Sequence, residues 1–188
     1  MKKVVFIIII FIIIGAALFL ILKNKGNKNQ QVPQAIINTK VMKIESSAFA
    51  DSQNIPAKYS CDSDGVNPPL SISGVPEKAR SLALTVADPD APNGLWVHWI
   101  MWNIPTSTTE ILENSVPQDA TQGQGSNGQK VYSGPCPPSG THHYIFTLYA
   151  LDAPVTIPSY SSLADLTHVI QDHILEQVHL TGLYSKAQ

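Results

Sequence analysis

The fold is decided by residues 81–104, which read SLALTVADPDAPNGLWVHWIMWNI. Near the start of this stretch Leu82, Leu84 and Val86 recur with a period of two, which predicts a β-strand with a buried face. Residues 96–104 are apolar on both faces, which predicts a central strand that is covered on each side. The proline-rich segment DPDAP between the two runs predicts a tight turn.

Apolar runs of similar length recur along the chain and are separated by turn residues. Residues 144–151 form another run that is apolar on both faces. Clusters rich in Pro and Gly lie at residues 67–69, 73–76, 88–92 and 134–138. Short strands between such turns predict a mainly β fold, an antiparallel sandwich.

One segment has the periodicity of a helix. Ser162 and Asp165 form a capping-box pattern, and apolar residues follow at helical spacing, which predicts a peripheral helix over residues 163–176. Residues 180–184 are predicted to form a last short strand. The polar, glycine-rich residues 114–130 are predicted to form a long loop.

The first forty residues differ from the rest of the chain. An uninterrupted apolar run at residues 4–22 is flanked by lysines and is long enough, at about 28 Å as a helix, to span a bilayer. We therefore predict a transmembrane anchor over residues 1–23, a flexible linker over 24–39 and one globular domain over 40–188. The expected location is the bacterial inner membrane, as a single-pass protein whose domain faces the periplasm. The alternative is a signal peptide that is cleaved near Gly15-Ala16-Ala17, which would release a secreted domain.

Charge and cysteine content exclude two classes of site. Residues 41–188 contain six Lys and Arg against fourteen Asp and Glu, and this acidic body lacks the basic stripe that nucleic acids require. Cys61 and Cys136 form no Cys-x-x-Cys pair, which excludes a zinc ribbon. We predict no metal site, no cofactor and no nucleic-acid partner.

Several polar residues lie next to the apolar strands and are candidates for a site. Asp88 and Asp90 lie in a turn whose prolines restrict the backbone. His98 lies on an apolar strand, and His142 and Tyr144 project from one face of another strand. Taken singly, the aspartates could merely cap a turn, and His98 could be a hydrogen-bonded core residue.

Two motifs resemble the signatures of the phosphatidylethanolamine-binding protein family. The first is DPDAP at residues 88–92 with WVHW at 96–99, and the second is GPCPP at 134–138 with GTHHY at 140–144. The spacing is similar to that of the bacterial branch called Raf-kinase-inhibitor-like proteins. The resemblance extends over about residues 44–184.

The resemblance implies a Greek-key β-sandwich with a pocket for phosphate-like anions and phospholipid head groups at one end of the sheet. The residues that it implies as pocket lining are Asp88, Asp90, His98, Gly134, Pro135, His142 and Tyr144. Tyr184 is a further expected neighbour. His143 stands where the family usually has arginine, which leaves open whether an ion pair forms from this position, and we assign His143 no role. Cys61 and Cys136 lie beside pocket segments and form either a disulfide or two small buried thiols.

The resemblance favours a non-enzymatic binding or regulatory module that is tethered to the membrane. Two alternatives stay open. The carboxylates and histidines could hold a metal or act as acid and base on a phosphoester, or the domain could dock on a protein as kinase and protease inhibitors do. The expected partners are a phosphate-like anion or phospholipid head group, the membrane through the anchor and, by analogy, a second copy in a homodimer.

Overall fold

The described part of the chain is mainly β, as predicted. The computed structural model describes residues 41–186. In chain order the elements are β1 (Lys43–Glu45), β2 (Gln53–Asn54), a short 3-10 helix (Ala57–Tyr59), β3 (Leu70–Ser73), β4 (Ser81–Asp88), β5 (Trp96–Ile104), β6 (Glu110–Ile111), β7 (Thr121–Gln122), β8 (Thr141–Leu151), α2 (Leu163–Ile170) and β9 (Ile174–Ser185).

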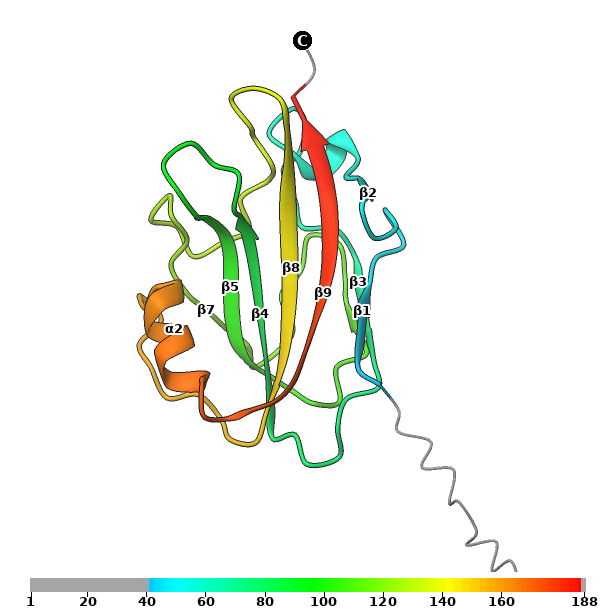
Figure 1. Cartoon of the computed structure of the whole chain (residues 1–188). Coiled ribbons are helices and arrows are strands. Elements are labelled where there is room, and N and C mark those ends of the chain that lie inside the picture. The colour runs from blue at the N-terminus through cyan, green and yellow to red at the C-terminus, as the bar shows by residue number, and fades with distance from the viewer. Residues whose placement is uncertain (1–40, 187–188) are drawn as a thin grey trace, which may run out of the picture. The chain divides into compact units, whose positions relative to one another are not determined.

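The strands form two sheets. The smaller sheet has the order β1-β3-β6, and the larger has the order β2-β9-β8-β4-β5-β7 (Figure 1). In the larger sheet β4 and β8 are central and antiparallel, and β8 pairs with β9 from Thr141 opposite Ser185 to Leu151 opposite Ile174. The expectation of Greek-key connections in a sandwich stays a prediction.

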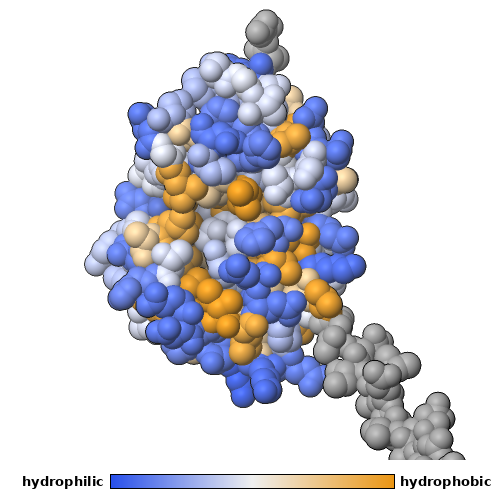
Figure 2. All heavy atoms as spheres, in the orientation of Figure 1, coloured by the Kyte–Doolittle hydropathy of each residue, from blue (hydrophilic) through white to orange (hydrophobic). Residues whose placement is uncertain are grey.

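Apolar side chains from both sheets pack into one large cluster. Ile44 and Ile72 of the smaller sheet belong to it together with Leu84 and Phe146 of the larger sheet. Burial of one such side chain stabilises the fold by about 1.5–3 kcal/mol. A second cluster joins α2, through Leu166 and Ile170, to the other face of β4 and β5. On the face shown in Figure 2, apolar residues also reach the surface near the middle, and hydrophilic residues surround them.

The predicted strand at residues 96–104 is confirmed with the same bounds, and its residues from Val97 onward are mostly buried. The capping box is also confirmed, because Ser162 accepts from the Asp165 N–H while the Asp165 carboxylate accepts from the Ser162 N–H. The predicted helix end at residue 176 is wrong. The helix ends at Ile170, and Ile174 begins β9 by pairing with Leu151, so strand pairing overrides the helical periodicity.

Strand pairing brings the candidate residues to one end of the larger sheet. Asp88, the last residue of β4, lies opposite Trp96, the first residue of β5. On the other side of β4, Ala87 lies opposite Ile145 of β8, so the start of β8 reaches the same end. His98, His142 and Asp88 therefore meet although up to 54 positions separate them in the sequence.

The predicted anchor (1–23) and the linker (24–39) lie outside the described residues. Within residues 41–186 no helix has both the length and the apolar character that crossing a membrane requires.

Candidate functional site

A cavity of about 440 Å³ lies at this end of the larger sheet. Five of the seven predicted residues line it: Asp88, His98, Gly134, His142 and Tyr144. Two larger cavities, of about 610 and 470 Å³, occur elsewhere in the described chain, but neither is lined by a paired carboxylate and imidazole. The convergence of polar groups, rather than volume, identifies the smaller cavity as the candidate site.

A buried ion-pair partner orients the first imidazole. Nδ1 of His142 lies 2.7 Å from Oδ2 of Asp88, and the exposed fractions of the two residues are 7% and 3%. The other carboxylate oxygen, Oδ1, accepts the backbone N–H of Asp90 at 2.8 Å. Because Asp88 is held at both oxygens, it fixes the ring of His142 and leaves Nε2 for a ligand.

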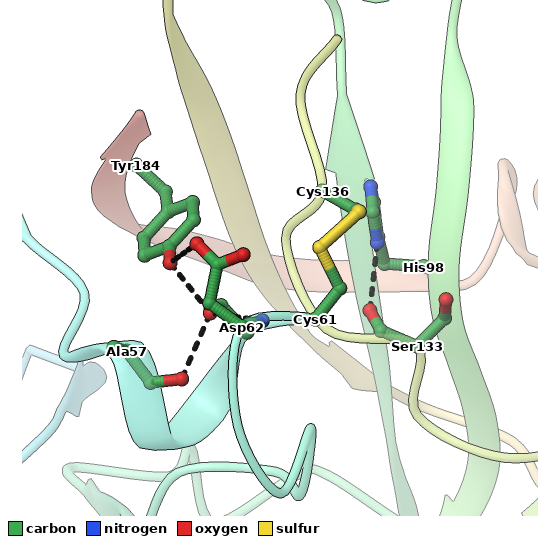
Figure 3. Close-up of a disulfide and its surroundings, with 8 residues drawn as sticks. Ala57, Cys61, Asp62, His98, Ser133, Cys136 and Tyr184 are labelled. Atoms are coloured by element: carbon green, nitrogen blue, oxygen red, sulfur yellow. Dashed lines mark hydrogen bonds between the residues drawn. A yellow bond between two sulfur atoms is a disulfide. The ribbon is translucent and has the colours of Figure 1, made fainter. Parts of the chain in front are cut away.

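A backbone carbonyl orients the second imidazole. Nδ1 of His98 donates to the carbonyl oxygen of Ser133 at 2.7 Å (Figure 3), and the Ser133 N–H donates to the carbonyl of His98 at 2.9 Å. The His98 ring also contacts the ring of Tyr144 edge-on, with centroids 5.1 Å apart. Burial lowers the pKa of His98, although the bond to Ser133 and the charge of Asp88 oppose this effect.

The Tyr144 hydroxyl is the unsatisfied group of the cavity. It is buried, and in the described part of the chain its proton has no acceptor, although the backbone N–H of Cys136 lies close enough to lower the pKa of the hydroxyl slightly. Burial, followed by the negative charge of Asp88, raises the pKa of Tyr144, so this group is a neutral donor at physiological pH. A buried hydroxyl without a partner costs about 1–3 kcal/mol, which a ligand that accepts its proton would recover.

The loop of residues 132–138 forms one wall of the cavity and is attached to the segment 57–62. The structure joins Cys61 to Cys136 by a disulfide, with Cα atoms 5.4 Å apart (Figure 3). The Cys61 N–H donates to the carbonyl of Pro135 at 3.0 Å. Gly134 lies so close to this segment that a Cβ atom there would be 2.7 Å from the carbonyl oxygen of Tyr59. A side chain at position 134 would therefore displace the wall from the segment 57–62.

Two predicted residues do not line the cavity. Pro135 is buried behind the wall and contributes its carbonyl to Cys61. Asp90 lies outside and accepts from Nδ1 of His143 at 2.7 Å and from its backbone N–H at 2.8 Å. The interaction with the imidazole holds the pKa of Asp90 below its usual range. The sequence left open whether His143 pairs with a carboxylate, and the structure pairs it with Asp90, because the turn brings Asp90 to the face of β8 opposite His142.

Tyr184 also lies apart from the cavity lining. Its hydroxyl accepts from Oγ of Ser60 at 2.7 Å and donates to Asp62 at 2.5 Å, beside the disulfide (Figure 3). Sequence reasoning missed the lining residues Ser133 and Cys136, which lack a recognisable chemical pattern. Cys136 was considered only as a possible disulfide partner.

Within the described range no group of three or more His, Cys, Asp or Glu side chains is arranged to hold a metal ion. The polar groups of the cavity are instead two imidazoles, one phenol and one carboxylate that is already paired. This set can donate hydrogen bonds to an anion and accept one from a ligand.

The chain is similar to known proteins over most of its length. The sequence model of the phosphatidylethanolamine-binding protein family matches residues 45–185. A UPF0098 protein of Methanothermobacter thermautotrophicus is 42% identical over 150 residues, which are 77% of this chain and 99% of the relative. A UPF0098 protein of Chlamydia pneumoniae is 43% identical over 153 residues, 78% of this chain and 100% of the relative.

Two solved structures have the same fold. A phosphatidylethanolamine-binding protein homologue of Chlamydia trachomatis superposes with a TM-score of 0.76 at 38% identity, covering 79% of this chain and 99% of the homologue. The Escherichia coli protein YbcL, described as a member of the mammalian PEBP family, superposes with a TM-score of 0.73 at 29% identity, covering 78% of this chain and 99% of YbcL.

The predicted localisation is corrected by these findings. The match to the Methanothermobacter thermautotrophicus protein covers 77% of this chain and 99% of that protein. That protein therefore has no segment equivalent to the unmatched part of this chain. The prediction rests on the apolar run at residues 4–22, which lies outside the described residues and outside the residues that the family model matches. We therefore withdraw the localisation as a single-pass membrane protein.

The resemblance noted in the two motifs, by contrast, is confirmed over most of the chain, and the chain belongs to the phosphatidylethanolamine-binding protein family.

Proposed function

We propose that this protein is a non-enzymatic binding module whose cavity takes a small phosphate-like anion, either free or as part of a phospholipid head group. One observation carries the proposal: the proton of the buried Tyr144 hydroxyl lacks an acceptor in the described chain, and this hydroxyl lines the same cavity as two oriented imidazoles. An oxygen of a bound anion would accept from this hydroxyl and satisfy it.

The chemistry of His142 supports an anionic ligand. Asp88 occupies Nδ1, so a protonated His142 would donate from Nε2 toward the cavity. The negative charge of Asp88 is not offered to the ligand, because His142 and the Asp90 N–H already occupy its two oxygens. When protonated, His142 therefore presents a positively charged N–H donor to the ligand, while the carboxylate lies behind it.

Isothermal titration of the full-length chain with inorganic phosphate and with O-phosphoethanolamine tests the proposal. We expect binding that weakens about tenfold or more in Tyr144→Phe and in His142→Ala, because a hydrogen bond to a charged group contributes about 1.5–3 kcal/mol. His173→Asn is a suitable control, since His173 pairs with Asp152 outside the cavity. The absence of binding at millimolar concentrations of either ligand would refute the proposal.

The Asp88–His142 pair also favours a second candidate, the hydrolysis of a phosphoester by acid–base catalysis. A carboxylate that orients an imidazole with a free Nε2 is an arrangement that can activate water. Release of p-nitrophenol from p-nitrophenyl phosphate distinguishes the two functions. Turnover that is lost in His142→Ala would favour the hydrolase, and binding without turnover would favour the module.

A further inference from the structure

We infer that the cavity selects a tetrahedral oxyanion that carries a hydroxyl group, such as hydrogen phosphate, over one that has none, such as sulfate. The inference deepens the proposed function and rests on it. It follows from which ring nitrogen of His98 donates a hydrogen bond and which one accepts.

The first step is the tautomer of His98. The group 2.7 Å from Nδ1 is the backbone carbonyl oxygen of Ser133, which can only accept a hydrogen bond. Nδ1 must therefore carry the proton. A neutral imidazole has a single N–H, so Nε2 of His98 presents a lone pair and acts as an acceptor.

The second step is the position of Nε2. Figure 3 shows the second ring nitrogen of His98 on the side of the ring away from Ser133. His98 lines the cavity, and the described residues supply Nε2 with no hydrogen-bond partner. Among the described residues, the Tyr144 hydroxyl is the one buried side-chain N or O atom without a hydrogen-bond partner. Since Nε2 of His98 also lacks a partner, it must be accessible, and it opens to the cavity. A ligand in the cavity therefore meets this lone pair.

The third step is the charge state of the ring. His98 is 5% exposed, and burial, which disfavours its charged form, lowers its pKa. The charged or titratable groups that face it are Asp88, His142 and Tyr144. A protonated His142 would oppose protonation of His98, and the carboxylate of Asp88 favours it but is already paired with His142. The neutral ring is therefore the form that meets a ligand at pH 8.

The last step compares His98 with Tyr144. The Tyr144 hydroxyl needs an acceptor, and Nε2 of His98 needs a donor. Hydrogen phosphate supplies both, because it has three acceptor oxygens and one hydroxyl. Sulfate has the same shape and, at pH 8, the same charge, but it has no proton, so one of its oxygens would lie against the lone pair of Nε2.

The test is a titration of the full-length chain at pH 8 with two matched pairs of anions. Hydrogen phosphate is compared with sulfate, and hydrogen arsenate with selenate. The members of each pair share charge and geometry and differ in one hydroxyl. We expect the hydroxyl-bearing member to bind at least about tenfold more tightly in both pairs, since an unsatisfied buried acceptor costs about as much as a hydrogen bond contributes.

His98→Asn isolates the responsible atom. The asparagine amide can still donate to the carbonyl of Ser133 but places no acceptor where Nε2 was, so the preference should fall to about twofold or less. His173→Asn is the matched control and should keep the preference. A third ligand, 2-aminoethyl hydrogen sulfate, has an ammonium donor and no hydroxyl, and it should bind as weakly as sulfate.

The outcomes separate the two proposals. Equal affinities within both pairs, tight binding of 2-aminoethyl hydrogen sulfate, or an unchanged preference in His98→Asn would overturn the inference and leave the anion site standing. Failure of all four inorganic anions to bind would overturn the proposed function and, with it, this inference. The tautomer can be read separately from long-range ¹H–¹⁵N correlations of His98, and a proton on Nε2 instead of Nδ1 would also overturn the inference.

Discussion

Nδ1 of His142 and Oδ2 of Asp88 lie 2.7 Å apart, and the exposed fractions of their side chains are only 9% and 5%. A buried pair of this kind is costly to break, because removal of one partner leaves the other desolvated and unpaired. The pair connects β8 to the end of β4, so it supports the fold as well as the site.

The first prediction concerns this pair. His142→Phe leaves Asp88 buried without its imidazole and should lower the free energy of unfolding by about 3–5 kcal/mol, measured by urea denaturation. Asp88→Asn combined with His142→Phe removes the stranded charge and should recover part of the loss. Effects of the two single changes that simply add in the double variant would show that the pair is not coupled.

The second prediction separates stability from binding at Tyr144. Tyr144→Phe removes a hydroxyl that has no partner in the described chain, so the unliganded protein should be as stable as the wild type, or more stable by about 1 kcal/mol. The same change should weaken phosphate binding about tenfold. Thermal melting with and without phosphate measures both effects. A large loss of stability in the unliganded variant would mean that the hydroxyl is satisfied within the protein.

The third prediction concerns pH. Burial lowers the pKa of His98 in the folded chain below its ordinary value of about 6.5. Between the two pKa values the unfolded chain binds a proton at this site and the folded chain does not, so stability is present above about pH 6.5 and is lost as the pH falls. Each tenfold difference in proton affinity corresponds to about 1.4 kcal/mol.

The contribution of His98 to the pH dependence is measured as the difference between the wild type and His98→Asn. Unfolding free energies from pH 8 to pH 5 should fall less steeply in His98→Asn than in the wild type. Parallel curves for wild type and His98→Asn would contradict the assignment of a depressed pKa to His98.

The fourth prediction concerns the disulfide. Cys61 and Cys136 are 75 positions apart, and in the chain-entropy model a cross-link over such a loop contributes about 4 kcal/mol. The doubly substituted Cys61→Ser/Cys136→Ser protein should lose stability of this order. It should also bind phosphate more weakly, because the wall at residues 132–138 loses its covalent attachment.

The chain has two cysteines, which provides an internal control. Dithiothreitol should reproduce the effect of the double substitution in the wild type and have no effect on the substituted protein. A wild type that melts at the same temperature with and without reductant would show that the bond contributes little.

The sequence was a reliable guide wherever a pattern had one physical reading. Residues 96–104 are mostly apolar on both faces, and a strand that is covered on each side buries most of them, so the bounds of β5 could be predicted. The end of α2 could not be predicted in this way. Residues 171–176 continue a helical pattern, and the choice of strand instead depends on Leu151, which is remote in the sequence.

The site could be predicted in part for the same reason. His142 and Tyr144 share a face by strand periodicity, and the structure places both in the cavity. The pairing of His143 with Asp90 depends on how the turn after β4 folds back over β8, which local pattern does not specify. The unsatisfied hydroxyl of Tyr144 depends on what surrounds it in three dimensions.

The pairing of β8 with β9 has an evolutionary consequence. His142, Tyr144 and Phe146 occupy alternate positions of one continuous ladder, so the face that lines the cavity also packs the core. A single-residue insertion or deletion between His142 and Phe146 would turn the residues on one side of it to the opposite face of the sheet, and so disrupt the cavity or the core. Length variation should therefore accumulate in connecting segments such as residues 112–120, while β8 changes only by substitution.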